Sequence, residues 1–534
     1  MTLPPKTQAP DVVIIGCGAG GGVIAKELGE AGVSVVVLEA GRRYNPTTDY
    51  PTNTVDFEVR APQVLHPEHD DHYRYTVPLG SGFAYNRVQG VGGSTLHYHG
   101  ISPRLQESDF RVRSEDGVAD DWPISYQDLE PFYTQVEYEL GVSGPTGDNP
   151  FDPPRSKPYP TPPHSFNCAS RVMKRGADKL GLHLVREPLA IPTKPWNGRP
   201  ACIGAGTCVV GCAIAAKSSI DVTYVPKAEA TGRVEIRPEC TAREITVGPN
   251  GRARSVIYFD AAGREQEISA RAVVVAGNAI ETPRLLLMSR STLFPEGLAN
   301  SSGLVGRYLM EHLGVWAYGQ FAERLDPWRG PPSGGVIQDY CATNTRNTFA
   351  RGWTIVVTFS SHWPLAVAWS VPGWGADHKA RTKQRFAHVT GVCSCGEQLP
   401  DVRNRVTLDP LVKDDFGLPV PHLVNRTSEN DRAMIATIRG RMQELLEAAG
   451  ATEIWGNQYW PGMPSHYMGT CRMGTDPATS VVDPWCRTHD VPNLFIGDGS
   501  VFVTGGAVNP ALSISALAAR TAAGIVAAFN RREL

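Results

Sequence analysis

The 534-residue chain lacks the marks of a membrane-spanning or nucleic-acid-binding protein. It has no run of about 18 uncharged apolar residues, which argues against a transmembrane helix. Its first residues, MTLPPKTQAP, contain neither the apolar core of a secretory signal nor a twin-arginine pair, so we expect a cytoplasmic protein. Charged residues make up 20% of the chain and the formal net charge is −3, so nothing in the charge indicates binding to nucleic acid.

Paired cysteines are also not indicated. The chain has eleven cysteines, which is an odd number, and they are expected to be mostly free thiols.

A chain of this length exceeds what a single hydrophobic core usually supports, so we expect two or more domains. Its 54 glycines and 43 prolines, beside 41% hydrophobic residues, indicate many ordered loops rather than disorder.

The segment from Asp11 to Glu39 has the order of a dinucleotide-binding βαβ unit. Its parts are a short apolar strand (Val12–Ile15), the G-x-G-x-x-G glycines (Gly16, Gly18 and Gly21), a helix ending near Gly32, a second strand (Val35–Leu38) and an acid (Glu39). The glycines allow a tight turn, close approach of a pyrophosphate and close helix packing. The phosphates would lie at the helix N-terminus, and Glu39 would accept hydrogen bonds from the adenosine ribose. A glycine-rich turn in an unrelated α/β protein is the alternative.

A second glycine segment, GVGGSTLHYH, begins at Gly90. Its adjacent glycines, Gly92 and Gly93, precede the hydroxyls of Ser94 and Thr95. Such a segment can bring backbone N–H groups against another part of a diphosphate or against a ring system. A simple hairpin or turn is the alternative interpretation.

Three cysteines, Cys202, Cys208 and Cys212, fall within eleven residues among glycines. They could hold an iron–sulfur cluster, although the usual four-cysteine spacings are absent. They could equally be the relic of such a site, or free thiols in a loop close to a cofactor.

The rest of the chain predicts short strands between residues 234 and 276, then a helix beyond Gly277. Residues 313–455 alternate strands with polar turns and contain many tryptophans, which line a pocket or pack in a core. An amphipathic helix is predicted over 431–449. Near the C-terminus, a strand at 493–496 is followed by Asn509 and Pro510, which suit the N-cap and first position of a final helix.

These pieces together resemble the glucose–methanol–choline (GMC) oxidoreductase family. The matching segments, in the family's order, are GCGAGGGVIAKEL with Glu39, GVGGSTLHYHG, GNAIETPRLLLMS, VGRYLMEH, EQLPDVRNRVTLDP, SHYMGTCRMG and VPNLFIGDGSVFVTGGAVNPALSISALA. The resemblance implies an α/β fold with a Rossmann-like FAD-binding domain and an inserted α+β substrate domain built on an antiparallel sheet. We place the FAD domain at 8–110, 225–312 and 462–534, a lid or connector with the cysteines at 111–224, and the substrate domain at 313–461.

The resemblance also implies roles for individual residues. His466 and Asn509 are the expected catalytic pair, with His466 as the base that accepts the hydroxyl proton during hydride transfer to the flavin. The positive end of the final helix would face the flavin. The expected FAD contacts are Gly16, Gly18, Ala19, Gly20, Gly21, Glu39, Ala40, Arg42, Gly92, Gly93, Ser94, His97, Ala276, Asp498, Asn509 and Pro510.

Two segments, RPACIGAGTCVVGCAIAAKSS and DWPISYQDLEPFY, are most similar to bacterial sugar-oxidising members of the family. We therefore expect FAD-dependent oxidation of a sugar or glycoside hydroxyl, with a non-sugar alcohol as the alternative substrate and a flavin-binding subunit without turnover as the alternative class. Oxygen, a quinone or dye, or an electron-transfer subunit would accept the electrons.

The residues around His97 differ from those of covalent flavoproteins, so FAD is expected to bind non-covalently. A [3Fe–4S] cluster on Cys202, Cys208 and Cys212 is an open prediction, because the residues flanking these cysteines depart from the cluster-bearing pattern.

Sugar recognition needs polar groups from more than one segment and an aromatic face. Besides the catalytic pair, the candidates are Asn457 and Gln458 for hydroxyls. For stacking they are Tyr459, Trp460 or a Trp of the inserted domain, such as Trp353, Trp363 or Trp369.

Overall fold

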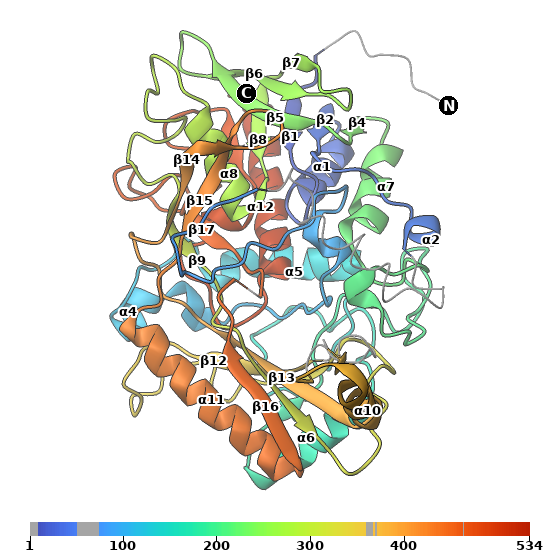
Figure 1. Ribbon diagram of the computed structural model, residues 1–534. Coiled ribbons are helices and arrows are strands. Elements are labelled where there is room, and N and C mark those ends of the chain that lie inside the picture. The colour runs from blue at the N-terminus through green and yellow to red at the C-terminus, as the bar shows by residue number, and fades with distance from the viewer. Residues whose placement is uncertain (1–8, 51–73, 359–366, 369–370, 463) are drawn as a thin grey trace.

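A computed structural model of the chain describes residues 9–50, 74–358, 367–368, 371–462 and 464–534. A five-stranded, all-parallel sheet forms the upper part of the molecule in Figure 1, where both termini also lie. Its strands, in spatial order, are β18 (Leu494–Ile496), β8 (Ala272–Val275), β1 (Val12–Ile15), β2 (Val35–Leu38) and β4 (Val234–Arg237).

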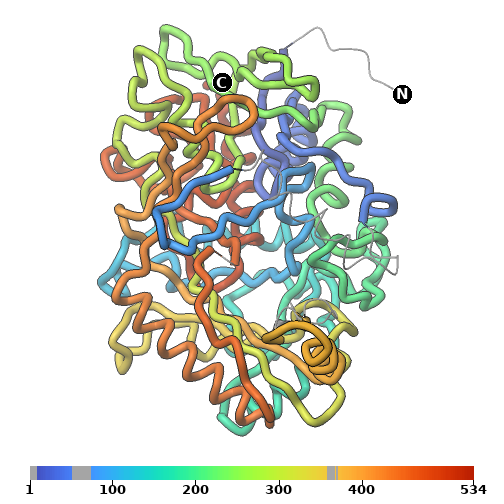
Figure 2. The backbone as a smooth tube through the Cα atoms, viewed as in Figure 1, coloured from blue at the N-terminus to red at the C-terminus, as the bar shows by residue number. Residues whose placement is uncertain are grey.

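The central strands of this sheet are rich in valine and isoleucine because both faces are covered. Every residue of β1, β2 and β8 is buried. The helices α1 (Gly21–Glu30) and α12 (Ala511–Asn530) pack against each other beside the sheet. The strands come from segments far apart in the chain. Figure 2 shows blue, green and red stretches of the chain lying together in this upper part of the molecule. The predicted Rossmann-like domain is therefore confirmed.

A six-stranded antiparallel sheet forms the lower part of the molecule (Figure 1). Its order is β16 (Glu453–Tyr459), β10 (Val315–Gln320), β13 (Val389–Gly396), β12 (Trp353–Thr358), β11 (Ser333–Ile337) and β3 (Leu184–Val185). The helices α6 (Cys168–Lys179) and α11 (Glu429–Ala449) pack against each other and share one apolar core with the sheet. This is the predicted substrate-domain sheet.

Two smaller sheets complete the fold. The four-stranded sheet has the order β15 (Pro419–Val424), β14 (Arg405–Lys413), β9 (Arg307–Met310) and β17 (Met468–Thr470). The three-stranded sheet is β5 (Thr241–Val247), β6 (Ala253–Phe259) and β7 (Glu265–Ser269). Further helices are α2 (Pro46–Asp49), α4 (Val112–Asp116), α5 (Tyr126–Leu140), α7 (Tyr224–Ala230), α8 (Asn278–Met288) and α10 (Gly375–Arg385). The predicted domain limits remain predictions.

The final helix begins one residue later than the sequence pattern indicates. Pro510, with helical backbone angles, occupies the N-cap position of α12, and no side chain caps the helix. The prediction that Asn509 is the N-cap is therefore wrong. The Asn509 amide instead contacts His466, as described below.

The helix α12 is long and apolar enough, by length and composition, to cross a membrane. However, 67% of its most apolar stretch is buried, and it packs against α1 and α5. In this structure it serves as a core helix. All eleven cysteines of the chain lie in the described residues and carry free thiols, as predicted.

Candidate active site

The two glycine segments meet at the N-terminus of α1. The Gly92 N–H donates to the Cys17 carbonyl at 2.9 Å, and a Cβ on Gly93 would lie 2.8 Å from the Gly18 Cα. No side chain caps α1, and its first turn contains no acidic residue. Free N–H groups at an uncapped helix start favour a phosphate. The loop therefore fits the pyrophosphate of the FAD that the resemblance implies.

Glu39 lies at the tip of β2 and holds both glycine segments. Its carboxylate accepts backbone N–H groups from Cys17 (2.8 Å), Gly41 (2.9 Å) and Gly90 (3.1 Å). Burial raises the pKa of this carboxyl to about 7, although the three N–H donors act in the opposite direction. The predicted contact between Glu39 and the adenosine ribose stays a prediction. The three backbone hydrogen bonds are enough to explain an acidic residue at this position.

Several other predicted cofactor residues also surround the loop. The Ala19 carbonyl accepts the Ser515 hydroxyl of α12 at 2.9 Å, and a Cβ on Gly16 would overlap the Ala276 carbonyl. Asp498 accepts the N–H of Asn278 at 2.9 Å, which joins the end of β18 to the start of α8. The structure therefore gathers the three chain segments of the predicted FAD domain around one helix start.

The remaining predicted cofactor residues are less closely tied to the loop. The Arg42 guanidinium lies 4.3 Å from the centre of the Tyr44 ring, while the Arg42 carbonyl accepts the Val91 N–H. Ala40 and His97 are half-buried, and Ser94 is exposed. Contacts between these side chains and FAD remain predictions.

The predicted catalytic residues meet in a buried polar cluster. His466 Nε2 and Asn509 Nδ2 are 3.1 Å apart, although 43 residues separate them in the chain. His466 Nδ1 lies 2.9 Å from His312 Nδ1, and His312 Nε2 lies 2.8 Å from the Gly506 carbonyl oxygen. The two imidazole rings are nearly perpendicular, at 86°.

Strand register explains why the two histidines meet. In the antiparallel pair of β9 and β17, Met310 stands opposite Met468. Continuing this register by two residues places His312 opposite His466. The backbone N–H of His466 also donates to the Glu311 carboxyl at 3.0 Å. Ser465, just before His466, has a φ of +59°, an uncommon backbone conformation that often marks functional sites.

Burial controls the charge state of this cluster. It lowers the pKa of His466 well below its usual value, with His312 and His99 acting in the same direction. It also lowers the pKa of His312. Burial raises the pKa of Glu311 to about 8, against the effect of two backbone N–H donors. At neutral pH both imidazoles are therefore neutral, so each has one protonated and one unprotonated nitrogen.

The six-stranded sheet closes one side of the cluster. The Thr354 hydroxyl of β12 donates to the Ala507 carbonyl at 2.9 Å, and the Cys395 thiol of β13 lies 3.8 Å from the Asn509 amide oxygen. Sequence reasoning did not assign a role to His312, Glu311 or Cys395. The segment VGRYLMEH contains the first two, but only the strand register shows what they contact.

The predicted sugar-binding residues lie on or beside the edge strand β16. Asn457 donates to the Arg439 carbonyl of α11, so its amide faces the helix. Its predicted role in binding a substrate hydroxyl stays a prediction. Gln458 stands opposite Trp316, and Trp460 is 52% exposed. Trp353 is buried in the core of the sheet and α11, whereas Trp363 and Trp369 lie outside the described residues.

The three predicted cluster ligands Cys202, Cys208 and Cys212 do not form a gathered group of metal ligands among the described residues. One set of histidine and cysteine side chains in the described residues has its ligand atoms within 4.8 Å of one another. It consists of His312, Cys395 and His466 and includes none of the three predicted cysteines. Burial raises the pKa of the Cys208 thiol to about 12. Cys202 and Cys212 accept backbone N–H groups from Gly204 and Lys217. The cluster stays a prediction that iron and labile-sulfide analysis would decide.

Comparison with known proteins agrees with this geometry. The GMC oxidoreductase family profile matches residues 29–314 and 400–518. The chain is 36% identical to 2-methyl-1,2-propanediol dehydrogenase of Mycolicibacterium austroafricanum, over 97% of this chain and 95% of the relative. It is 33% identical to the fructose dehydrogenase large subunit of Gluconobacter japonicus, over 98% of each chain. A formate oxidase structure from Aspergillus oryzae shares the fold, with a TM-score of 0.69 and 17% identity over 99% of this chain and 100% of that one.

The family profile covers more than half of the chain, and two relatives exceed 30% identity over nearly its full length. The chain is an FAD-dependent oxidoreductase that acts on CH–OH donors. It belongs to the GMC oxidoreductase family.

Proposed function

We propose that this enzyme oxidises a hydroxyl group of a sugar or glycoside to a carbonyl, with His466 as the base. The observation that carries the proposal is the buried pair of His466 Nε2 and Asn509 Nδ2, which lie 3.1 Å apart. A hydroxyl oxygen beside both could accept a hydrogen bond from Asn509 and give its proton to His466. Bound FAD supplies the acceptor for the hydride that leaves the same carbon.

A chain of hydrogen bonds sets which nitrogen of His466 accepts that proton. The Gly506 carbonyl can only accept, so His312 Nε2 carries the hydrogen. In the neutral His312 ring, Nδ1 is then an acceptor, and His466 Nδ1 must donate to it. His466 Nε2 is left unprotonated and faces the Asn509 amide. His312 is in this view a positioning residue that fixes the tautomer of the base.

Removing His312 should therefore slow the chemical step. We expect His312→Met to lower kcat by about 10- to 100-fold, similar to the loss of other groups that orient a functional histidine, with little change in KM. His312→Gln should recover much of this loss, since its amide can donate to Gly506 and accept from His466. Steady-state kinetics of both purified variants measures this. Equal losses in both variants, or a change confined to KM, would remove His312 from this role.

The substrate proposal depends on the polar groups of the site and on a relative. The fructose dehydrogenase large subunit is named for a sugar, and 98% of each chain is covered. The buried cluster offers imidazole, amide and thiol groups where a small-alcohol enzyme would need an apolar pocket. A site that binds hydroxyls rejects ligands that lack them, because its polar groups would stay unpaired.

We expect a glucose-type sugar or a glycoside to have a higher kcat/KM than any short-chain or aromatic alcohol. The measurement is a substrate screen of the purified enzyme with one dye acceptor throughout, repeated with oxygen to identify the electron acceptor. If benzyl alcohol or a linear alcohol exceeds every sugar and glycoside tested, the sugar assignment is wrong.

A non-sugar alcohol is the second candidate substrate. Similarity to the 2-methyl-1,2-propanediol dehydrogenase favours it, since that relative is named for a small diol. The same screen separates the two candidates when this diol is included. His466 and Asn509 would have the same roles with either substrate.

A further inference from the structure

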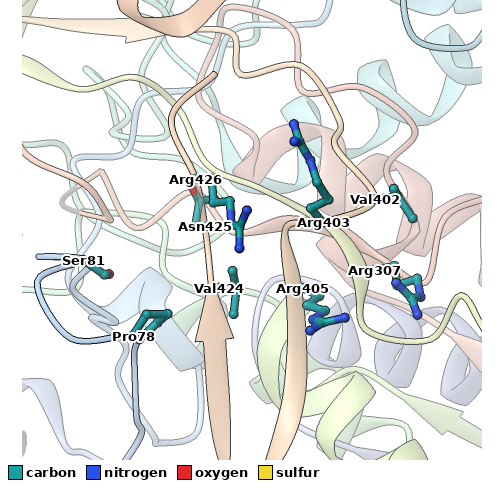
Figure 3. A pocket seen from close by; sticks show the side chains of 9 residues that line it. All are labelled: Pro78, Ser81, Arg307, Val402, Arg403, Arg405, Val424, Asn425 and Arg426. Atoms are coloured by element: carbon teal, nitrogen blue, oxygen red, sulfur yellow. The ribbon is translucent and has the colours of Figure 1, made fainter. Parts of the chain in front are cut away.

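A pocket of about 450 Å³ lies beside the four-stranded sheet and contains none of the proposed catalytic residues. Figure 3 shows its lining side chains, four of which are arginines. These are Arg307, Arg403, Arg405 and Arg426. The other lining residues are Pro78, Ser81, Val402, Val424 and Asn425, and none of the nine is acidic.

The sheet register brings the arginines together. Arg307 of β9 and Arg405 of β14 stand directly opposite each other in an antiparallel pair. Arg405 also stands opposite Val424 of β15, and extending this register by two residues places Arg403 opposite Arg426. Directly opposed side chains of an antiparallel pair lie on the same face, and like charges in that arrangement repel.

Few negative charges offset these arginines. Asp401 pairs with Arg403 at 2.6 Å, and Arg403 and then Arg426 hold the pKa of Asp401 below its usual range. In the described part of the chain, no carboxylate forms an ion pair with Arg307, Arg405 or Arg426. The Arg307 Nε donates to the Gly303 carbonyl. The folded enzyme thus keeps opposed positive charges together without a matching number of acids.

We propose that this pocket is a binding site for a small phosphorylated molecule. A phosphate carries up to two negative charges and three acceptor oxygens, so several guanidinium groups can bind it at once. A carboxylate has one charge and is satisfied by a single bidentate arginine, which makes it a poorer match to three guanidinium groups without acidic partners. The apolar side chains of Pro78, Val402 and Val424 can contact the organic part of the ligand.

The test is calorimetric titration of the FAD-saturated enzyme with sodium pyrophosphate at low ionic strength. We expect saturable binding that Arg307→Ala and Arg405→Ala each weaken by about 10-fold or more, the usual effect of losing a charged hydrogen bond. Arg405→Lys keeps the charge but loses the planar fork, so its affinity should fall between wild type and Arg405→Ala. Arg264→Ala is the matched control, because Arg264 is an exposed arginine paired with Asp260 in the turn between β6 and β7.

Two further readouts separate this site from the active site and from a surface effect. Pyrophosphate should raise the melting temperature of the wild type but not of the Arg307→Ala/Arg405→Ala double variant. Oxidation of the alcohol substrate should be unchanged in both single variants. No saturable binding at millimolar pyrophosphate, or equal weakening by Arg264→Ala, would overturn the proposal. Sedimentation with vesicles of phosphatidylcholine and phosphatidic acid, without binding of pyrophosphate, would instead indicate a lipid surface and also overturn it.

Discussion

Replacing His466 by alanine is expected to lower turnover by about 10²- to 10⁴-fold, the usual contribution of a positioned acid–base group, while FAD stays bound. His466 Nε2 lies beside the Asn509 amide, and burial keeps its imidazole neutral. It can therefore accept a proton at neutral pH. The glycine loop at α1 consists of other residues, so the cofactor should remain in place.

The measurement is kcat at saturating substrate, together with the flavin content of the purified variant. His183→Ala is a suitable control, since His183 is an exposed histidine paired with Asp339. Near-normal kcat in the His466→Ala variant, with full flavin content, would remove His466 from the mechanism.

The wild-type activity should also persist below pH 6.5. Protonation of the His466 imidazole stops the reaction only below its lowered pKa, so a pH–rate profile measures this directly.

Two glycine-to-alanine changes in one loop should have different consequences. At Gly20, a Cβ would overlap the Gly497 carbonyl, which is backbone and cannot move aside. Overpacking of this kind costs about 1–3 kcal/mol or more, so Gly20→Ala should lower the melting temperature and lose FAD. At Gly18, a Cβ would meet only the Gly93 Cα, at an ordinary 3.8 Å.

Gly18→Ala should therefore fold normally yet bind FAD at least about 10-fold more weakly, since the new methyl group lies where a pyrophosphate approaches the backbone. Thermal melting of the FAD-free proteins and titration with FAD measure the two effects separately. Wild-type FAD affinity in Gly18→Ala would place the pyrophosphate elsewhere. Wild-type stability in Gly20→Ala would contradict the close packing of α1 against the turn after β18.

Local patterns predicted the cofactor side of the enzyme well. The strands β1 and β2 have the predicted limits, because a short valine-rich run between a glycine motif and an acid has few alternative structures. The predicted helix at 431–449 begins at Glu429, after a capping box formed by Ser428 and Asp431. The helix α5 likewise begins at Tyr126, after a capping box formed by Ser125 and Asp128.

The parts that depend on pairing between distant segments could not be predicted. His312 and His466 are 154 residues apart, and only the register of β9 and β17 brings them together. The opposed arginines Arg307 and Arg405 depend on another long-range register. Asn509 was expected to cap a helix, since Asn before Pro usually does so, but its amide contacts the base instead. Side-chain partners of this kind leave no local periodicity in the sequence.

The most direct test of the central claim is anaerobic mixing of the purified protein with sugars, glycosides and simple alcohols, followed by the flavin absorbance. The proposed function predicts a yellow protein whose absorbance is bleached fully by a sugar or glycoside, at a rate that falls at least about 10²-fold in His466→Ala. A folded protein that takes up no FAD, or a bound flavin that stays oxidised with every hydroxyl compound tested, would contradict it.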